Sequence, residues 1–397
     1  MSPLVKGDMA RLRHAVAGIT VAIFFTLMGG GLLGSLIGVR AKRAGISPGI
    51  MGIAMAMYYL GFLLGMPLMG RALERLSRRA MFAASAGVMG LAASGYGLAV
   101  TPPAWLLLRM ASGFGLAGCY LVVETWLHDL SPNHVRGRVM GLYVAMSAGG
   151  LVAGQLVLGL TDPSSWIAFA LAGAITTLSW IPLLFVVDGV TTRHSRAGMM
   201  RFREVARAVP SGVIGYVLVG VTQGCLITMA SVYAARAGLG TRQVGYYVGA
   251  VTAGAVALQI PIGSIADRIS RRMVMVVLCT VTVVLCAFSM VVNAGSLSSY
   301  VLAFVIGGCS SPLYALGNSY THDWLPPGQV VAASSALLMT YSVGAVCGPL
   351  IAAAAMTSFG VQGFFWALIV GHSALALFMG YRMVVAPDRS ALIAGVD

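Results

Sequence analysis

Twelve long apolar runs, separated by short polar segments, constrain this chain more than any other feature of its sequence. A helix needs about 20 predominantly apolar residues to cross the roughly 30 Å hydrocarbon core of a bilayer. The 397 residues are 58% hydrophobic and only 9% charged, which excludes a secreted enzyme, a nucleic-acid-binding domain and a coiled coil. We therefore predict transmembrane helices at 15–37, 48–69, 80–100, 104–127, 139–160, 166–187, 210–235, 243–265, 273–293, 297–321, 330–353 and 361–381.

The basic residues are distributed unevenly between the two sets of predicted loops. With the N-terminus placed in the cytoplasm, 19 of the 25 lysines and arginines fall on the cytoplasmic side. The positive-inside rule then predicts that both termini are cytoplasmic. The net charge of +14 is thereby a feature of membrane topology, so we expect contact with the lipid bilayer and none with nucleic acid.

An internal repeat divides the chain into two halves. The segment from Arg43 to Arg79 aligns without a gap to the segment from Arg236 to Arg272, 193 residues later, and both begin with R-A-G and end with S-R-R. Parallel repeats of six spans predict a pseudo-two-fold axis along the membrane normal, with a solute site between the halves near the midplane. We predict an all-α polytopic membrane fold with six-helix bundles at 1–187 and 210–397 and a cytoplasmic linker at 188–209, which is either an interfacial helix or a solvated basic segment.

The chain offers little that holds a metal, a cofactor or a nucleotide. All six cysteines fall in apolar runs and resemble small buried hydrophobes. The pairs His128–Asp129 and His322–Asp323 are related by the repeat, which explains them better than metal binding does. Neither of the two lysines follows the glycine loop of an ATP site. We expect no metal and no cofactor, so uphill work must draw on an ion gradient.

Several motifs resemble those of the major facilitator superfamily. G-R-A-L-E-R-L-S-R-R at 70–79 and G-S-I-A-D-R-I-S-R-R at 263–272 are similar to its loop signature after spans 2 and 8. D-L-S-P-N-H-V-R-G-R at 129–138 and R-M-A-S-G-F-G at 109–115 are similar to its elements after and within span 4. Within the superfamily, the resemblance to the YcaD-type bacterial transporters rests on L-V-V-E-T-W-L at 121–127, P-L-Y-A-L at 312–316 and L-P-P-G-Q-V-V-A-A-S at 325–334.

The resemblance covers essentially the whole chain and implies a secondary transporter of the bacterial inner membrane. It also implies a cytoplasmic charge network that stabilises one of two alternating-access states; the alternative is that the arginines only anchor the loops to anionic lipid. The predicted gate residues are Gly70, Glu74, Arg75, Arg78, Arg79, Asp129, Arg136, Arg138, Gly263, Asp267, Arg268, Arg271 and Arg272.

Two charges lie inside the predicted fourth span, Arg109 and Glu124. At 100° per residue they share one face with Tyr120, and we expect this face to line the central cavity. A charge costs about 2.5–3.5 kcal/mol at the centre of a span, so both need a partner or water. They are about 22 Å apart along the helix and cannot pair directly. We predict that they serve proton coupling, with Glu124 changing protonation; the alternative is a static pairing of Glu124 with Arg136 or Arg138.

Polar side chains in other spans are candidates for contact with the solute. Asn318 stands 194 residues after Glu124, and because an amide does not titrate, we place the proton site in the first half. For Gln155, Gln223 and His372, packing or interhelical hydrogen bonding is an equal alternative. The predicted cavity residues are Tyr120, Gln155, Gln223, Gln259, Tyr314, Asn318 and Tyr341.

We predict a monomeric, proton-coupled secondary transporter for a small organic solute, working by alternating access, and not an enzyme. A solute sensor that keeps the fold, or a membrane-embedded enzyme, is the alternative. The direction of transport stays open between efflux and uptake. Gly141, Gly150 and Gly154 keep the glycine spacing of the family's antiporters, but Gln155 stands where those proteins have proline.

Overall fold

The computed structural model describes residues 3–186, 210–322 and 330–385. These residues form helices joined by turns and short loops, with no strand among them. Within this part of the chain, twelve segments are long and apolar enough to cross a membrane. The predicted all-α membrane fold is thereby confirmed.

The helices lie at the predicted spans, and α1 extends beyond the predicted 15–37 at both ends. The first half contains α1 (Pro3–Arg43), α2 (Pro48–Leu73), α3 (Arg78–Leu98), α4 (Pro102–Leu130), α5 (Asn133–Val157), η1 (Leu158–Leu160), α6 (Trp166–Leu178) and η2 (Ile181–Phe185). The second half contains α8 (Pro210–Arg236), α9 (Thr241–Ala266), α10 (Arg271–Ser289), α11 (Leu297–Ser310), α12 (Pro312–His322), α13 (Val330–Ser358), η4 (Gly360–Gln362) and α14 (Gly363–Val385).

Two predicted spans contain a break beside a proline. The run 297–321 divides into α11 and α12 at Ser311, and Pro312 begins the second piece. The run 166–187 divides into α6 and the 3₁₀-helix η2, which contains Pro182. Proline lacks an N–H donor and its ring crowds the preceding turn, so a continuous α-helix is unfavourable at both places.

The Cα positions group the chain into two compact units. Each unit follows one predicted half except for a short exchanged segment, because the start of α2 groups with the second half and the start of α9 with the first. The linker 188–209 lies outside the described residues, so its interfacial helix stays a prediction. Unit 1 comprises Met1–Ile46, Met57–Ser195 and Gly240–Gly245, and unit 2 comprises Ser47–Ala56, Arg196–Leu239 and Tyr246–Asp397.

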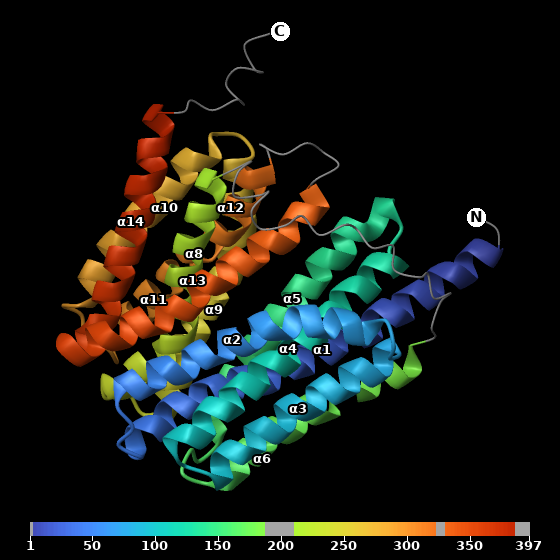
Figure 1. Ribbon diagram of the computed structural model, residues 1–397, viewed down its shortest axis with the longest axis horizontal. Helices are drawn as coiled ribbons and strands as arrows, with labels where there is room; N and C mark the ends of the chain where they lie inside the picture. Colours follow the sequence, from blue (N-terminus) through green and yellow to red (C-terminus); the bar gives the residue numbers. More distant parts are fainter. Residues whose placement is uncertain (1–2, 187–209, 323–329, 386–397) are drawn as a thin grey trace. The chain divides into compact units, whose positions relative to one another are not determined.

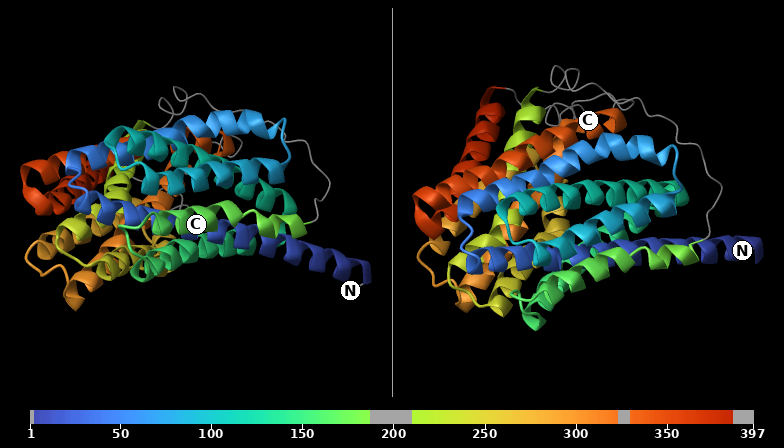
Figure 2. Two further views of the ribbon diagram at one scale, coloured as in Figure 1. Left: turned by 90° about the horizontal axis from the view of Figure 1, so that it is seen from below. Right: turned by 60° about the horizontal axis from the view of Figure 1, so that its bottom comes forward.

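Each unit has its own helix packing and core. In unit 1, α1 packs along α5 and α6, and α3 lies against both α4 and α6 (Figure 1). Both views in Figure 2 show α1, in dark blue, beside α6, in bright green. In unit 2, α8 packs along α13, and α14 contacts α10 and α8. Phe82 and Trp126 belong to the buried core of unit 1, and Met275 and Leu313 to that of unit 2.

The repeat in the sequence recurs in the helix contacts. A Cβ atom on Gly61 would lie 2.0 Å from the carbonyl oxygen of Met110, and one on Gly254 would lie 1.8 Å from that of Phe304. Glycine is therefore required where α2 meets α4 and where α9 meets α11. The two contacts are repeat-related, so the halves share a local packing mode as well as a sequence pattern.

Gly61→Ala should destabilise unit 1, because the added methyl group must push the backbone of α4 away. Overpacking of this kind typically costs about 1–3 kcal/mol, so we expect a lower unfolding temperature of the purified protein. Gly87→Ala is the matched control, since a Cβ at Gly87 in α3 has nothing within 4 Å. Equal unfolding temperatures for the two variants would contradict the required close approach.

Candidate functional site

Glu124 lies inside α4, and its described partner comes from α5. The Tyr143 hydroxyl donates a hydrogen bond to Glu124 Oε1 at 3.1 Å. Tyr143 is buried, whereas Glu124 is exposed. Arg136 instead donates to the carbonyl of Ser131 at 3.2 Å. In the part of the chain that the structure describes, Glu124 forms no ion pair with Arg136 or Arg138. Sequence reasoning missed Tyr143, because α5 carries no signal that points this residue toward α4.

Arg109, two turns into the same helix, lies in the interior of unit 1. It is only 6% exposed. Its guanidinium carbon lies 5.4 Å from the ring centroid of Tyr58 in α2 and 5.9 Å from that of Tyr96 in α3. Arg109 and Glu124 thus have separate surroundings, as expected from their separation of about 22 Å along the helix.

Three tyrosines gather in unit 2. The ring of Tyr314 in α12 lies 5.0 Å from that of Tyr341 in α13 and 5.6 Å from that of Tyr216 in α8. The Tyr216 hydroxyl also donates to the carbonyl of Tyr314 at 3.1 Å. The structure therefore brings two predicted cavity residues together and adds Tyr216. The repeat gives no signal for Tyr216, because the equivalent position in the first half is Ile23.

Gln223 and His372 belong to a buried hydrogen-bond network. The Gln223 amide donates to the carbonyl of Ser310, beside the break at Pro312. Ser310 Oγ lies 3.0 Å from His372 Nε2, and His372 Nδ1 lies 2.8 Å from the carbonyl oxygen of Leu368. A carbonyl only accepts, so Nδ1 carries the proton and the Ser310 hydroxyl donates to Nε2. These contacts favour interhelical hydrogen bonding for both residues.

The remaining cavity candidates are dispersed over several helices. The ring of Tyr120 lies 6.4 Å from that of Phe62, edge to face, which joins α4 to α2. Gln155 is buried in α5. Gln259 in α9 and Asn318 in α12 are partly exposed. For these four residues, contact with a solute stays a prediction.

One ion pair joins two of the predicted gate elements. Arg78, the first residue of α3, pairs with Asp129 in the last turn of α4. The Arg78 guanidinium also lies 5.9 Å from the ring centroid of Trp126. Ser77 caps α3 by accepting a hydrogen bond from the Ala80 amide at 3.2 Å, which fixes where the helix presents Arg78. The pair links the S-R-R loop to the D-L-S-P motif.

The second arginine of each S-R-R motif binds a backbone carbonyl. Arg79 donates to the carbonyl of Val186, directly after η2. Arg272 donates to the carbonyl of Arg382 in the last turn of α14, at 3.1 Å, and to the hydroxyl of Tyr320 at 2.8 Å. A cation at the carboxyl end of a helix is favourable because the terminal carbonyls carry partial negative charge. Both arginines thus contact the last span of their own half.

The other gate candidates are mostly at the surface. Arg271 and Asp267 lie 3.9 Å apart, one helical turn from each other in sequence. A Cβ atom on Gly70 or Gly263 would have nothing within 4 Å, so neither glycine marks a close helix contact in this structure. The candidates with exposed side chains are Glu74, Arg75, Arg138, Asp267 and Arg268.

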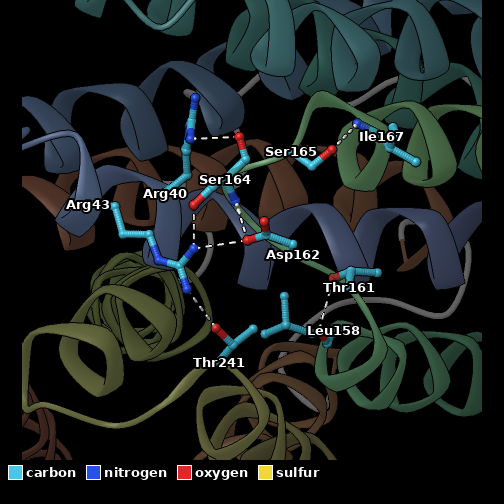
Figure 3. Close-up of polar contacts among 9 residues, drawn as sticks. All are labelled: Arg40, Arg43, Leu158, Thr161, Asp162, Ser164, Ser165, Ile167 and Thr241. Carbon is cyan, nitrogen blue, oxygen red and sulfur yellow. Dashed lines mark hydrogen bonds and ion pairs between the residues drawn. The ribbon is translucent and has the colours of Figure 1, made fainter.

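A further charged cluster lies at the other end of unit 1 (Figure 3). Arg43, the last residue of α1, pairs with Asp162 at 3.0 Å and donates to the hydroxyl of Ser164. Its second terminal nitrogen lies 3.3 Å from the hydroxyl of Thr241, the first residue of α9. Arg40 donates to the Ser164 carbonyl at 2.9 Å. We call these five residues the Arg43 cluster.

The turn that holds Asp162 is stabilised by a hydrogen bond of its own, in addition to the contact with Arg43. The Ser164 amide donates to Asp162 Oδ1 at 2.9 Å. This hydrogen bond, reinforced by Arg43, holds the pKa of the Asp162 carboxyl below its usual value. Sequence reasoning missed the cluster. Its signals were the Asp-Pro-Ser turn and the position of Arg43 at the start of the first repeat copy.

No group of three His, Cys, Asp or Glu side chains suited to a metal ion occurs in residues 3–186, 210–322 and 330–385. Asp323, one member of the repeated His-Asp pairs, lies outside these ranges. The polar groups described above are single charges inside helices, a group of tyrosines, and ion pairs at helix ends.

Comparison with known proteins places these features in a family. The family model of the Major Facilitator Superfamily matches residues 19–211 and again residues 212–395. The uncharacterized MFS-type transporter YfkF of Bacillus subtilis (strain 168) is 27% identical over 364 residues, covering 88% of this chain and 91% of that protein. The uncharacterized MFS-type transporter YcaD of Escherichia coli O6:K15:H31 (strain 536 / UPEC) is 25% identical over 353 residues, with the same coverage.

Solved structures give the same fold. The nucleoside transporter NupG superposes with a TM-score of 0.77 at 12% identity, covering 94% of this chain and 99% of that one. A bacterial homolog of the human lysosomal transporter Spinster, in an inward-facing and occupied conformation, superposes with a TM-score of 0.72 at 14% identity, covering 93% and 94%. The duplicated match, the twelve apolar helices and the repeat-related contacts make this chain a membrane transporter protein of the Major Facilitator Superfamily.

Proposed function

We propose that the chain is a monomeric secondary active transporter of the bacterial inner membrane, which moves a small organic solute by alternating access and couples this movement to protons. The family supports transport, and the uneven distribution of basic residues supports cytoplasmic termini. The coupling ion and the cycle are our inference from the charged groups of the spans and loops.

The Glu124–Tyr143 hydrogen bond carries this proposal. A carboxylate at this depth is unfavourable in an apolar bilayer unless it is hydrated or hydrogen-bonded, and it is retained where it serves an ion or proton pathway. Tyr143 stabilises the carboxylate without neutralising it, because a neutral hydroxyl donates one hydrogen bond and no charge. Glu124 is also exposed on α4, and we infer that this exposed side faces water, from which a proton reaches the carboxylate. We infer that Glu124 takes up and releases the transported proton.

Two charged clusters in unit 1 support a pair of gates. The Arg78–Asp129 ion pair lies at the end where α3 begins and α4 ends, which the positive-inside rule predicts to be cytoplasmic. The Arg43 cluster lies where α1 ends, on the predicted outer side. Thr241 in this cluster begins α9, which continues from unit 1 into unit 2. Breaking the Arg43 cluster releases the start of α9 from the end of α1, and we infer that this release accompanies outward opening.

Asp162→Asn should shift the protein toward the outward-open state. It removes the charge that Arg43 binds, and because the pair is exposed, we expect a population change of at most about fivefold. Spin labels at Leu98 and Val291, repeat-equivalent and exposed positions on the outer side, report this population by their distance distribution. Asn at this position should move the distribution toward longer distances, and an unchanged distribution would remove the Arg43 cluster from the outer gate.

The contribution of Asp162 should not vary between pH 5 and 8. Because its pKa is lowered in the folded protein, the carboxylate is charged throughout that range. Its contact with Arg43 is present above the ordinary pKa of aspartate and is lost only as the pH falls through the lowered value. The substitution should therefore change the ratio of outward-open to inward-open protein, measured from the Leu98–Val291 distances, by the same factor at both ends of the range. A difference that vanishes at pH 5 would contradict this.

The direct test of transport begins with a thermal-shift screen of nucleosides, other metabolites and antibiotics on the purified protein. A radiolabelled hit is then measured in proteoliposomes for counterflow and for accumulation under an imposed proton gradient. Both activities are expected. Binding without counterflow would identify a solute sensor, and chemical conversion of the hit would identify an enzyme.

A further inference from the structure

Trp105 and Arg109 present two buried N–H donors that lack an acceptor. Trp105 is 0% exposed and Arg109 is 6% exposed. The indole Nε1 of Trp105 and the Nε of Arg109 have no hydrogen-bond partner among the described residues. The two side chains stand one helical turn apart on the same face of α4, since residues i and i+4 are neighbours on a helix.

The surroundings of these donors are aromatic. The Tyr96 ring lies 5.5 Å from the Trp105 ring and 5.9 Å from the Arg109 guanidinium carbon. Its hydroxyl donates to the carbonyl of Trp105 at 3.3 Å, and no hydrogen bond from Arg109 or from the Trp105 indole to this hydroxyl is recorded. The ring centroid of Tyr58, in α2, lies 5.4 Å from the Arg109 guanidinium carbon. A cation enclosed by rings is partly stabilised, but ring faces do not accept the several N–H bonds of a guanidinium in its own plane.

Arg272 shows how this protein otherwise treats a buried arginine. It is 1% exposed and lies 4.8 Å from the centroid of the Tyr320 ring, so its burial and its ring contact match those of Arg109. Arg272 also has two oxygen acceptors, the Tyr320 hydroxyl and the Arg382 carbonyl. The Nε of Arg272 has no hydrogen-bond partner among the described residues either, so the difference lies in the terminal nitrogens. In the residues that the structure describes, no oxygen acceptor is recorded for the terminal nitrogens of Arg109, and no carboxylate lies within 4.0 Å of them.

We propose that Arg109 and Trp105 bind a single small inorganic anion of the size of chloride. An anion accepts hydrogen bonds from both donors and neutralises the guanidinium, which an enclosed charge needs. A water molecule would bring two hydrogens of its own, which need acceptors that this donor-rich setting does not supply. Because both side chains are buried, the body of an organic solute does not reach them in this structure.

The proposed anion gives Arg109 a structural role in place of the proton coupling that we predict for it from the sequence. Glu124 is about 22 Å away along α4, too far for direct contact. The groups around the anion belong to α2, α3 and α4, so the anion holds these three helices together by compensating a charge at their junction. It follows that Arg109 should stabilise the protein when chloride is present and destabilise it when chloride is absent.

The experiment is a chloride titration of the purified full-length protein in lipid nanodiscs, with sodium gluconate keeping the ionic strength constant. We expect a saturable rise in the unfolding temperature of several degrees with chloride or bromide and none with gluconate. Trp105→Phe removes one hydrogen-bond donor to the anion and should raise the chloride concentration at half-saturation about tenfold. Arg109→Gln should lose the rise altogether, yet match or exceed wild type in gluconate.

Two matched controls separate the site from general effects. Arg272→Gln removes a buried arginine that has acceptors, and Trp126→Phe alters another buried tryptophan of α4. Both should keep the full chloride-dependent rise, whatever their stability in gluconate. If Arg109→Gln fails to fold, equilibrium binding of radioactive chloride to wild type and Trp105→Phe decides the matter. No saturable chloride binding, or an equal rise in wild type and Arg109→Gln, would overturn the proposal and leave water at these donors.

Discussion

Glu124→Gln should abolish accumulation of the solute under a proton gradient while leaving solute exchange intact. Glutamine keeps the size of the side chain and accepts the hydrogen bond from Tyr143, but it does not titrate. A driving force of 100 mV stores about 2.3 kcal/mol per charge, enough for roughly 50-fold accumulation at one proton per solute. We expect the variant to reach a concentration ratio of about one and to retain counterflow, both measured in the same proteoliposomes.

Two further variants test whether the carboxylate itself is required. Glu124→Asp keeps a titrating group and should retain part of the accumulation. Tyr143→Phe removes the described hydrogen-bond donor and should retain accumulation with a changed pH dependence, because the hydrogen bond favours the charged form of Glu124. Full accumulation by Glu124→Gln would show that the proton binds elsewhere.

Reversing either charge of the Arg78–Asp129 pair should shift the conformational population strongly. The side chains are 17% and 35% exposed, so this bond is more protected than that of Arg43 with Asp162. A hydrogen bond to a charged group contributes about 1.5–3 kcal/mol, which corresponds to a population change of about 10- to 100-fold. We expect Arg78→Asp or Asp129→Arg to favour the inward-open state. Spin labels at Leu76 and Ile269, exposed loop positions related by the repeat, measure that opening.

The double reversal, with Arg78→Asp and Asp129→Arg together, should return the population toward that of wild type. Arg71→Gln is the matched control. Arg71 is exposed in the last turn of α2, close in sequence to Arg78 at the start of α3, so the substitution removes a charge from the same loop region. If the arginines served only as anchors to anionic lipid, Arg71→Gln and Arg78→Gln would act alike, and the double reversal would not recover the wild-type distances.

Sequence reasoning succeeded where local pattern determines structure. Hydropathy located the spans, and the repeat related the two halves, in which the structure shows equivalent close contacts at Gly61 and Gly254. The family motifs also pointed to Arg78 and Asp129, which the structure joins. The spans and the repeat rest on periodicity and spacing, which can be read along the chain, whereas the two gate residues rest on the resemblance to the family.

Sequence reasoning failed where a charged side chain binds a residue that is distant in sequence, or binds a backbone atom. Arg43 and Asp162 are 119 residues apart, and no single motif contains both of them. Arg79 and Arg272 bind carbonyl groups, which every residue carries and no sequence pattern reveals. The surroundings of Arg109 were likewise hidden, because they depend on which neighbouring helices face α4.

Double electron-electron resonance on two label pairs tests the central claim most directly, in a variant without native cysteines. One pair, Leu98→Cys with Val291→Cys, reports the outer side, and the other, Leu76→Cys with Ile269→Cys, reports the inner side. Alternating access predicts that Arg78→Asp, Asp162→Asn and a change of pH each move the two distance distributions in opposite directions. Distributions that lengthen together, or that stay fixed under all three changes, would contradict it.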